Sequence, residues 1–215
     1  MTPGDALLNL DLFIEGFVCV VALLISAFSL RTYLLTRQRK HFFFAGAFGL
    51  LAGGIALSAL LNYFVEFEHL QILLRGYLNI GVELGYLLAA SQFLVLSGFM
   101  TLYLVNSEIK DKRAIIMLYM MTFFAAIVAH EVYLLYHVTA FIIVGCVFSH
   151  YLVNYERQHT RSSLLVLLAF TSLLIAEAVL SFVLFNFWFY VIGNALRALG
   201  FVLFLIALIQ IYAKR

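Results

Sequence analysis

Charge is scarce in this chain. Only 11% of its 215 residues are Asp, Glu, Lys or Arg, whereas 65% are hydrophobic. Soluble domains carry about 25% charged residues, and a soluble fold of this size could not bury so much apolar surface. The net charge of +2 gives no reason to expect a nucleic-acid partner. The composition therefore excludes a soluble domain and favours a membrane protein.

Proline, cysteine and catalytic motifs are also scarce. The only proline is Pro3, so no apolar run contains the proline-broken helix that often forms a transporter site. Cys19 and Cys146 lie in apolar runs without paired spacing, which favours buried thiols over redox or metal chemistry. The sequence has no nucleophile motif, phosphate loop or pair of catalytic aspartates. It therefore indicates no catalytic residues and does not favour an enzyme.

Polar residues divide the chain into seven apolar runs. Each is long enough for a membrane span, and only helices or closed barrels satisfy the backbone in lipid. The runs are too long and too evenly apolar for barrel strands. We therefore predict an all-α bundle of seven transmembrane helices, near Leu12–Leu34, Phe42–Phe64, Gly76–Leu104, Ala114–Ala129, Val132–Val153, Leu164–Phe185 and Phe187–Tyr212.

Basic residues predict the orientation. Eleven of the thirteen lie on one side of the predicted spans, and the other side has acids but no basic cluster. By the positive-inside rule the N-terminus is outside and the C-terminus cytoplasmic. We expect an integral protein of a prokaryotic cytoplasmic membrane, surrounded by lipid. The eleven residues are Arg31, Arg37, Arg39, Lys40, Lys110, Lys112, Arg113, Arg157, Arg161, Lys214 and Arg215.

Short matches along the chain suggest an internal repeat. Phe28-Ser29 and Arg37-Gln38 match Phe148-Ser149 and Arg157-Gln158 at an offset of 120 residues. The stretch "NIGVELGY" from Asn79 matches "NALRALGF" from Asn194 at an offset of 115. We therefore predict a single transmembrane domain with three parts. A three-helix repeat (12–104) and a second, parallel repeat (132–212) are joined by a linker helix (114–129).

This arrangement resembles that of the sugar-transporting sweet proteins and, more loosely, microbial rhodopsins. The last run has no lysine before Lys214 that could carry retinal, and the helices lack the prolines of the sweet family. The chain also resembles uncharacterised prokaryotic seven-helix proteins with an Arg-rich turn followed by aromatic residues. These resemblances imply an architecture and no function.

Small residues recur in the second run, where Ala45, Gly49 and Gly53 are four apart and Gly46 and Gly54 are eight apart. Small residues at this spacing let helices approach closely in lipid. We interpret them as a packing stripe.

Ionisable residues within the apolar runs are the main functional signal, because a charge in the bilayer is costly and normally faces a partner inside the bundle. We expect Arg197 to pair with Glu83, Glu177 or both, in the outer half of the membrane. The cluster is either a structural lock between the repeats or a ligand or ion site. The candidate site residues are Glu83, Arg197, Glu177, Asn79, Asn194, Arg75, Tyr86 and Tyr190, with Glu15 nearer the surface.

Histidines on the outer side offer a metal alternative. His130, Glu131 and His137 could ligate a metal, although their spacing differs from that of the metalloprotease motif. The other reading is that these histidines are hydrogen-bonded or lie at the membrane interface. No cofactor is expected apart from this metal.

Three functions are compatible with these features. The one we favour is binding of a small solute or ion in an outer polar cavity, by a transporter or sensor. The alternatives are a structural or accessory subunit of a larger membrane complex and, third, a metal-dependent membrane enzyme. A homo-oligomer or a partner membrane subunit is compatible with the first two.

Overall fold

A computed structural model describes residues 3–66, 80–107, 109, 111–129 and 133–213 of the chain. This part of the chain is helical, and its seven helices are each long and apolar enough to cross a membrane. They are α1 (Pro3–Thr36), α2 (Arg39–Glu66), α4 (Ile80–Asn106), α5 (Lys112–Ala129), α6 (Tyr133–Gln158), α7 (Arg161–Leu180) and α8 (Phe187–Ala213).

The sixth predicted span extends too far at its C-terminal end. It was expected to reach Phe185, but α7 ends at Leu180. The hydroxyl of Ser181 donates to the Glu177 carbonyl at 2.9 Å, and successive turns follow. The next helix begins where the Asn186 side chain accepts a hydrogen bond from the backbone N–H of Trp188 at 3.1 Å, as helix-capping residues do. The helix therefore ends five residues before Phe185, the predicted end of the span.

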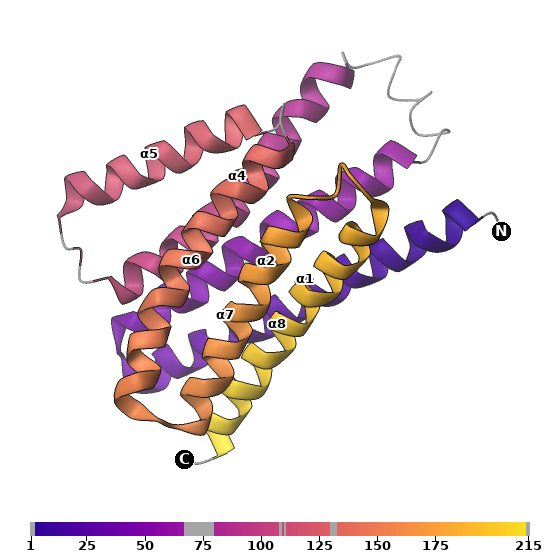
Figure 1. Ribbon diagram of the computed structural model, residues 1–215. Helices are drawn as coiled ribbons and strands as arrows, with labels where there is room; N and C mark the ends of the chain where they lie inside the picture. The colour runs from indigo at the N-terminus through magenta and orange to yellow at the C-terminus, as the bar shows by residue number, and fades with distance from the viewer. Residues whose placement is uncertain (1–2, 67–79, 108, 110, 130–132, 214–215) are drawn as a thin grey trace.

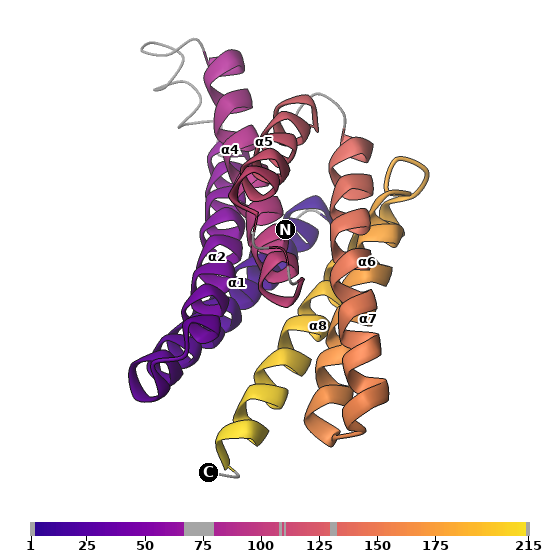
Figure 2. The same ribbon diagram turned by 90° about the vertical axis from the view of Figure 1, so that its left-hand side faces the viewer.

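The helices form two groups with one helix outside them. In the first group α2 packs against α1 and α4, and in the second α7 packs against α6 and α8. The groups meet where α1 packs on α8 and α4 on α6. Helix α5 packs against α4 and α6 at the side of the bundle, as Figures 1 and 2 show.

The two groups contain similar tight turns. Two residues join α1 to α2, and two join α6 to α7. The first residue of each turn has a left-handed backbone, with φ of 56° at Arg37 and 47° at His159. Each donates its N–H to a tyrosine carbonyl four residues earlier, that of Tyr33 or Tyr155, which is a common way to end a helix. Figure 1 places both turns and the C-terminal end of α8 at one end of the bundle.

Glycines bring the helices of each group together. A Cβ at Gly98 of α4 would lie 2.7 Å from Leu51 and 2.9 Å from the Ala47 carbonyl of α2. A Cβ at Gly200 of α8 would lie 2.9 Å from Leu173 and 3.1 Å from the Ala169 carbonyl of α7. These separations are too short for a larger residue, so both contacts depend on glycine.

Phenylalanines pack where the groups meet. Phe48 of α2 packs on Phe201 and Phe204 of α8, with ring centroids 6.4 and 5.5 Å apart. Phe170 of α7 packs on Phe204 at 4.7 Å. All four are buried. This aromatic core lies beside the cavity described next, because Phe201 contributes to both.

Candidate functional site: a polar cavity between the two helix groups

A cavity of about 340 Å³ lies between the two groups. Residues of α1, α2 and α4 line it from the first group, and residues of α6, α7 and α8 from the second. It lies toward the bundle end opposite the tight turns, because Asn62, Leu180 and Tyr190 are near the end of α2, the end of α7 and the start of α8. The polar side chains that line it are Glu15, Ser58, Asn62, Ser91, Gln92, Tyr136, His137, Tyr190, Asn194 and Arg197.

One side of the cavity is a charged cluster of three residues from three helices. The Glu177 carboxylate, on α7, is only 1% exposed. Its Oε1 accepts a hydrogen bond from Nη2 of Arg197 at 2.9 Å, and its Oε2 lies 2.7 Å from Nδ1 of His137. Arg197 is 21% exposed and His137 only 3%. The His137–Glu177–Arg197 cluster therefore ties α6, α7 and α8 together while Arg197 and His137 also face the cavity.

The opposite side has one carboxylate and two side-chain amides, whose oxygens can accept hydrogen bonds. Nδ2 of Asn62 lies 3.5 Å from Oε2 of Glu15, a long contact. Gln92 is 8% exposed, and among the described residues its Oε1 has no hydrogen-bond partner. Such an unsatisfied buried oxygen costs free energy. We call Glu15, Asn62 and Gln92 the acceptor wall.

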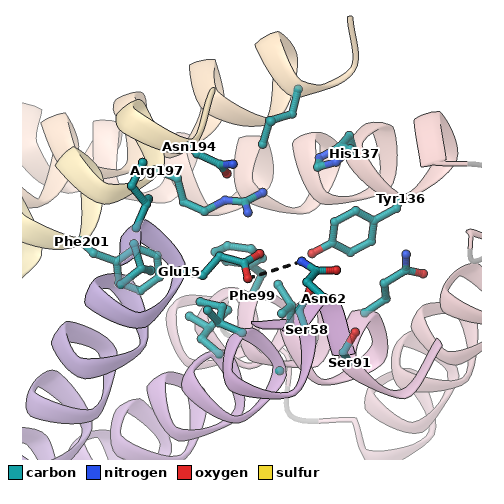
Figure 3. Close-up of a pocket in the computed structure, with 18 of the residues that line it drawn as sticks. Glu15, Ser58, Asn62, Ser91, Phe99, Tyr136, His137, Asn194, Arg197 and Phe201 are labelled. Atoms are coloured by element: carbon teal, nitrogen blue, oxygen red, sulfur yellow. Dashed lines mark hydrogen bonds between the residues drawn. The ribbon is translucent and has the colours of Figure 1, made fainter. Parts of the chain in front are cut away.

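Aromatic rings complete the lining. Figure 3 shows Tyr136 of α6 directing its hydroxyl into the cavity, toward Asn62, while Glu15 and Arg197 extend into the same space from opposite sides. Phe99 and Phe201 line the part next to the aromatic core. The cavity thus combines a few convergent polar groups with apolar and aromatic surface, as small-molecule sites do.

Fourteen of the twenty lining residues form pairs at two fixed spacings. Residues of α1 and α2 match residues of α6 and α7 that lie 122 positions later, and residues of α4 match residues of α8 that lie 102 later. Two of these pairs keep the chemical type, an amide in Gln92 with Asn194 and a phenylalanine in Phe99 with Phe201. The pairs are Ile14 with Tyr136, Glu15 with His137, Ser58 with Leu180, Leu88 with Tyr190, Gln92 with Asn194, Val95 with Arg197, and Phe99 with Phe201.

The structure brings some of the predicted site residues together. Arg197 and Glu177 are in direct contact, and Asn194 and Tyr190 line the cavity beside them. His137, predicted as a metal ligand with His130 and Glu131, contacts Glu177. Tyr86 is 70% exposed and is not among the lining residues.

The other predicted residues cannot be placed in the site. Glu83 belongs to α4, but its side chain lies outside the described residues. Asn79, Arg75, His130 and Glu131 also lie outside them. Among the described residues no group of three His, Cys, Asp or Glu side chains is arranged to hold a metal.

Sequence reasoning missed most of the acceptor wall. It placed Glu15 in the outer half of the membrane, nearer the surface than Glu83, Glu177 and Arg197, and did not consider Asn62, Gln92 or Tyr136. The available signal was an uncharged amide inside an apolar run, which is costly to bury unless it is hydrogen-bonded. Asn62 and Gln92 both carry this signal.

Comparisons with protein-family models, with curated protein sequences and with solved structures find no match to this chain.

Proposed function

We propose that this protein binds a small polar solute in the cavity between its two helix groups and transports it across a prokaryotic cytoplasmic membrane. The observation that carries the proposal is the cavity of about 340 Å³, because its volume and its mixture of convergent polar and aromatic groups suit a small ligand. A purely structural ion pair needs no such space beside it. A transporter is favoured over a sensor because transporters with parallel repeats bind substrate at the interface between the repeats.

The proposal includes a parallel internal repeat, in which α1, α2 and α4 correspond to α6, α7 and α8 and α5 is the linker. The spacings of 122 and 102 residues support it beyond the cavity. Gly98 packs on Leu51 as Gly200 packs on Leu173, and Phe48 and Phe170 both belong to the aromatic core. The buried residues Val18, Ala22 and Ile25 likewise correspond to buried Ala140, Val144 and Val147.

This register differs from the one expected from short sequence matches. It aligns "QFLVLSGF" (92–99) with "NALRALGF" (194–201), so that Gly200 corresponds to Gly98 rather than to Gly85. It also aligns Tyr33 with Tyr155, whose carbonyls both accept the bond that ends a helix. The fall in offset from 122 to 102 places the extra residues of the first copy between α2 and α4.

The proposed orientation puts the N-terminus outside. Arg37 and Arg39 lie at the α1–α2 turn and Arg157 and Arg161 beside the α6–α7 turn, at one end of the bundle. By the positive-inside rule that end is cytoplasmic. The cavity lies toward the other end and is therefore in the outer half of the membrane.

A thermal-shift screen in lipid nanodiscs tests solute binding. A ligand that binds only the folded state at 100 times its Kd stabilises that state by about 2.7 kcal/mol. We expect at least one small polar solute to raise the Tm of the wild-type protein. The Ser58→Leu variant, which fills part of the cavity, should lose that shift. The lipid-facing Ser149→Leu control should keep it, because Ser149 is exposed on α6. Equal shifts in both variants would place binding elsewhere.

A further inference from the structure

The two sides of the cavity differ in what they offer a ligand. On the second-group side, Arg197 donates to Glu177 and so has part of its hydrogen-bonding capacity already used within the protein. On the acceptor wall, the Glu15 carboxylate also has a contact within the protein, 3.5 Å from Nδ2 of Asn62, whereas Oε1 of Gln92 is buried and accepts no bond from the described residues. The side chain best placed to gain a hydrogen bond from a ligand is therefore an acceptor.

The proposed repeat shows the same difference between the two sides of the cavity, position by position. In its register, Glu177 corresponds to Ile55 and Arg197 to Val95, and both apolar residues line the cavity. The second group thus has an ion pair where the first has an apolar surface. Near that surface stand Glu15, the counterpart of His137, and Gln92, the counterpart of Asn194. The first-group half of the cavity therefore combines acceptors, one negative charge and an apolar floor.

We infer that the solute is a protonated amine with a compact apolar body. Its ammonium group donates to the Glu15 carboxylate and to Oε1 of Gln92, and its body packs against Ile55, Val95 and the ring of Phe99. An aromatic ring also favours a cation over its face. The inference rests on the proposed function, since it assigns a ligand class to the same cavity.

The test uses thiol reagents of opposite charge. Ser58→Cys is introduced into the full chain, with Cys19 and Cys146 replaced by serine, and is reacted with a cationic and an anionic methanethiosulfonate of similar size. Each rate is divided by the reagent's rate with free cysteine. We expect the cationic reagent to react about tenfold faster than the anionic one, as a nearby carboxylate in a partly shielded site would cause. Glu15→Gln should remove most of this preference, and the exposed control Glu156→Gln should retain it.

Protection against labelling tests the donor–acceptor match. Butylammonium should slow modification of Ser58→Cys, whereas butyrate and butanol should not. Gln92→Leu keeps every charge but removes the acceptor, so it should weaken protection by butylammonium several-fold. Protection that is unchanged or stronger in Gln92→Leu would overturn the inferred contact.

The outcomes separate the two proposals. If neither reagent modifies Ser58→Cys in the folded protein, the cavity admits no solute and the proposed function fails. If both modify it at equal corrected rates, or the anionic reagent is faster, the cavity is open but the amine inference is wrong. If Glu15→Gln leaves the preference unchanged, Glu15 does not select the ligand, and the inference is again contradicted.

Discussion

Replacing Glu177 with alanine is expected to lower the free energy of unfolding by about 3–5 kcal/mol, the usual result of removing one partner of a buried ion pair. The carboxylate is 1% exposed and accepts from Arg197 at 2.9 Å while lying 2.7 Å from His137. Its loss leaves Arg197 without this counter-ion and Nδ1 of His137 without this contact. Because the three residues belong to three helices, the second helix group should loosen as a unit.

Equilibrium unfolding in mixed micelles measures this effect, with Glu156→Ala as the control for an exposed acid on α6. The control should change stability by less than about 0.5 kcal/mol, as surface substitutions usually do. The double variant Glu177→Leu with Arg197→Leu should be more stable than Glu177→Ala, because it removes the unpaired charge together with its partner. A loss below about 1 kcal/mol in Glu177→Ala would show that the cluster does not hold the helices together.

Substitution by alanine should destabilise the protein at Gly54 of α2 but not at the adjacent Gly53. A Cβ at Gly54 would lie 2.6 Å from Cγ2 of Val95 and 2.8 Å from the Ser91 carbonyl, so Gly54→Ala forces α2 and α4 apart. Overpacking of this kind costs about 1–3 kcal/mol. A Cβ at Gly53 would meet no atom within 4 Å. Gly53→Ala should therefore be neutral, or stabilising by up to about 1 kcal/mol through helix propensity.

The same unfolding measurement compares the two variants directly. Gly46→Ala is a second control, since a Cβ there also meets nothing within 4 Å. The account is contradicted if Gly54→Ala is as stable as Gly53→Ala, because α2 and α4 would then not be in the close contact described.

The spacing of the small residues in α2 predicted only part of how this helix packs. Its spacing predicted a packing surface, and Gly54 does pack closely on α4. However, Gly46 and Gly53 have no such neighbour, and Gly49 approaches only the hydroxyl of Ser26 on α1. Spacing identifies which residues share a face of the helix, but it does not reveal which face meets another helix and which meets lipid.

The number and type of the helices were predictable because hydropathy dominates in a chain of this composition. The all-helical architecture with seven helices long enough to cross a membrane agrees with the prediction over the described residues. The end of α7 was not predictable from hydropathy, because residues 181–185, which form turns, are mostly apolar.

The register of the proposed repeat was hard to predict from the sequence. Apolar helices match one another at many offsets, and "NALRALGF" fits both the stretch from Asn79 and the stretch from Gln92. Packing distinguishes them, since Gly98 and Gly200 meet equivalent leucines and carbonyls on the neighbouring helix. Contacts between helices therefore carry the information that composition lacks.

Part of the candidate site followed from charge. An arginine and an acid in apolar runs predicted that Arg197 would find a carboxylate, and Glu177 is in contact with it. The sequence could not show that His137 completes the cluster, nor that Glu15, Asn62 and Gln92 converge from three different helices. Convergence depends on helix rotation, which neither depth nor spacing determines.

The predicted structural lock was to join the two repeats, whereas the contacts of the His137–Glu177–Arg197 cluster join helices within the second group. The His137–Glu177–Arg197 cluster has the burial and the contacts of a lock between α6, α7 and α8. The acceptor wall contains the buried Oε1 of Gln92, which has no hydrogen-bond partner among the described residues. In our account the cluster stabilises the second helix group, and the acceptor wall gives the cavity its preference for a solute.

The central claim, that a polar cavity within the bundle admits water-soluble molecules, is tested most directly by hydroxyl-radical footprinting in lipid nanodiscs. Radicals formed from water should oxidise Tyr136, whose ring lines the cavity, clearly faster than Phe170, which is fully buried in the aromatic core. Butylammonium should reduce oxidation of Tyr136 alone. If Tyr136 is as unreactive as Phe170, the space is dry and the solute-binding account is contradicted.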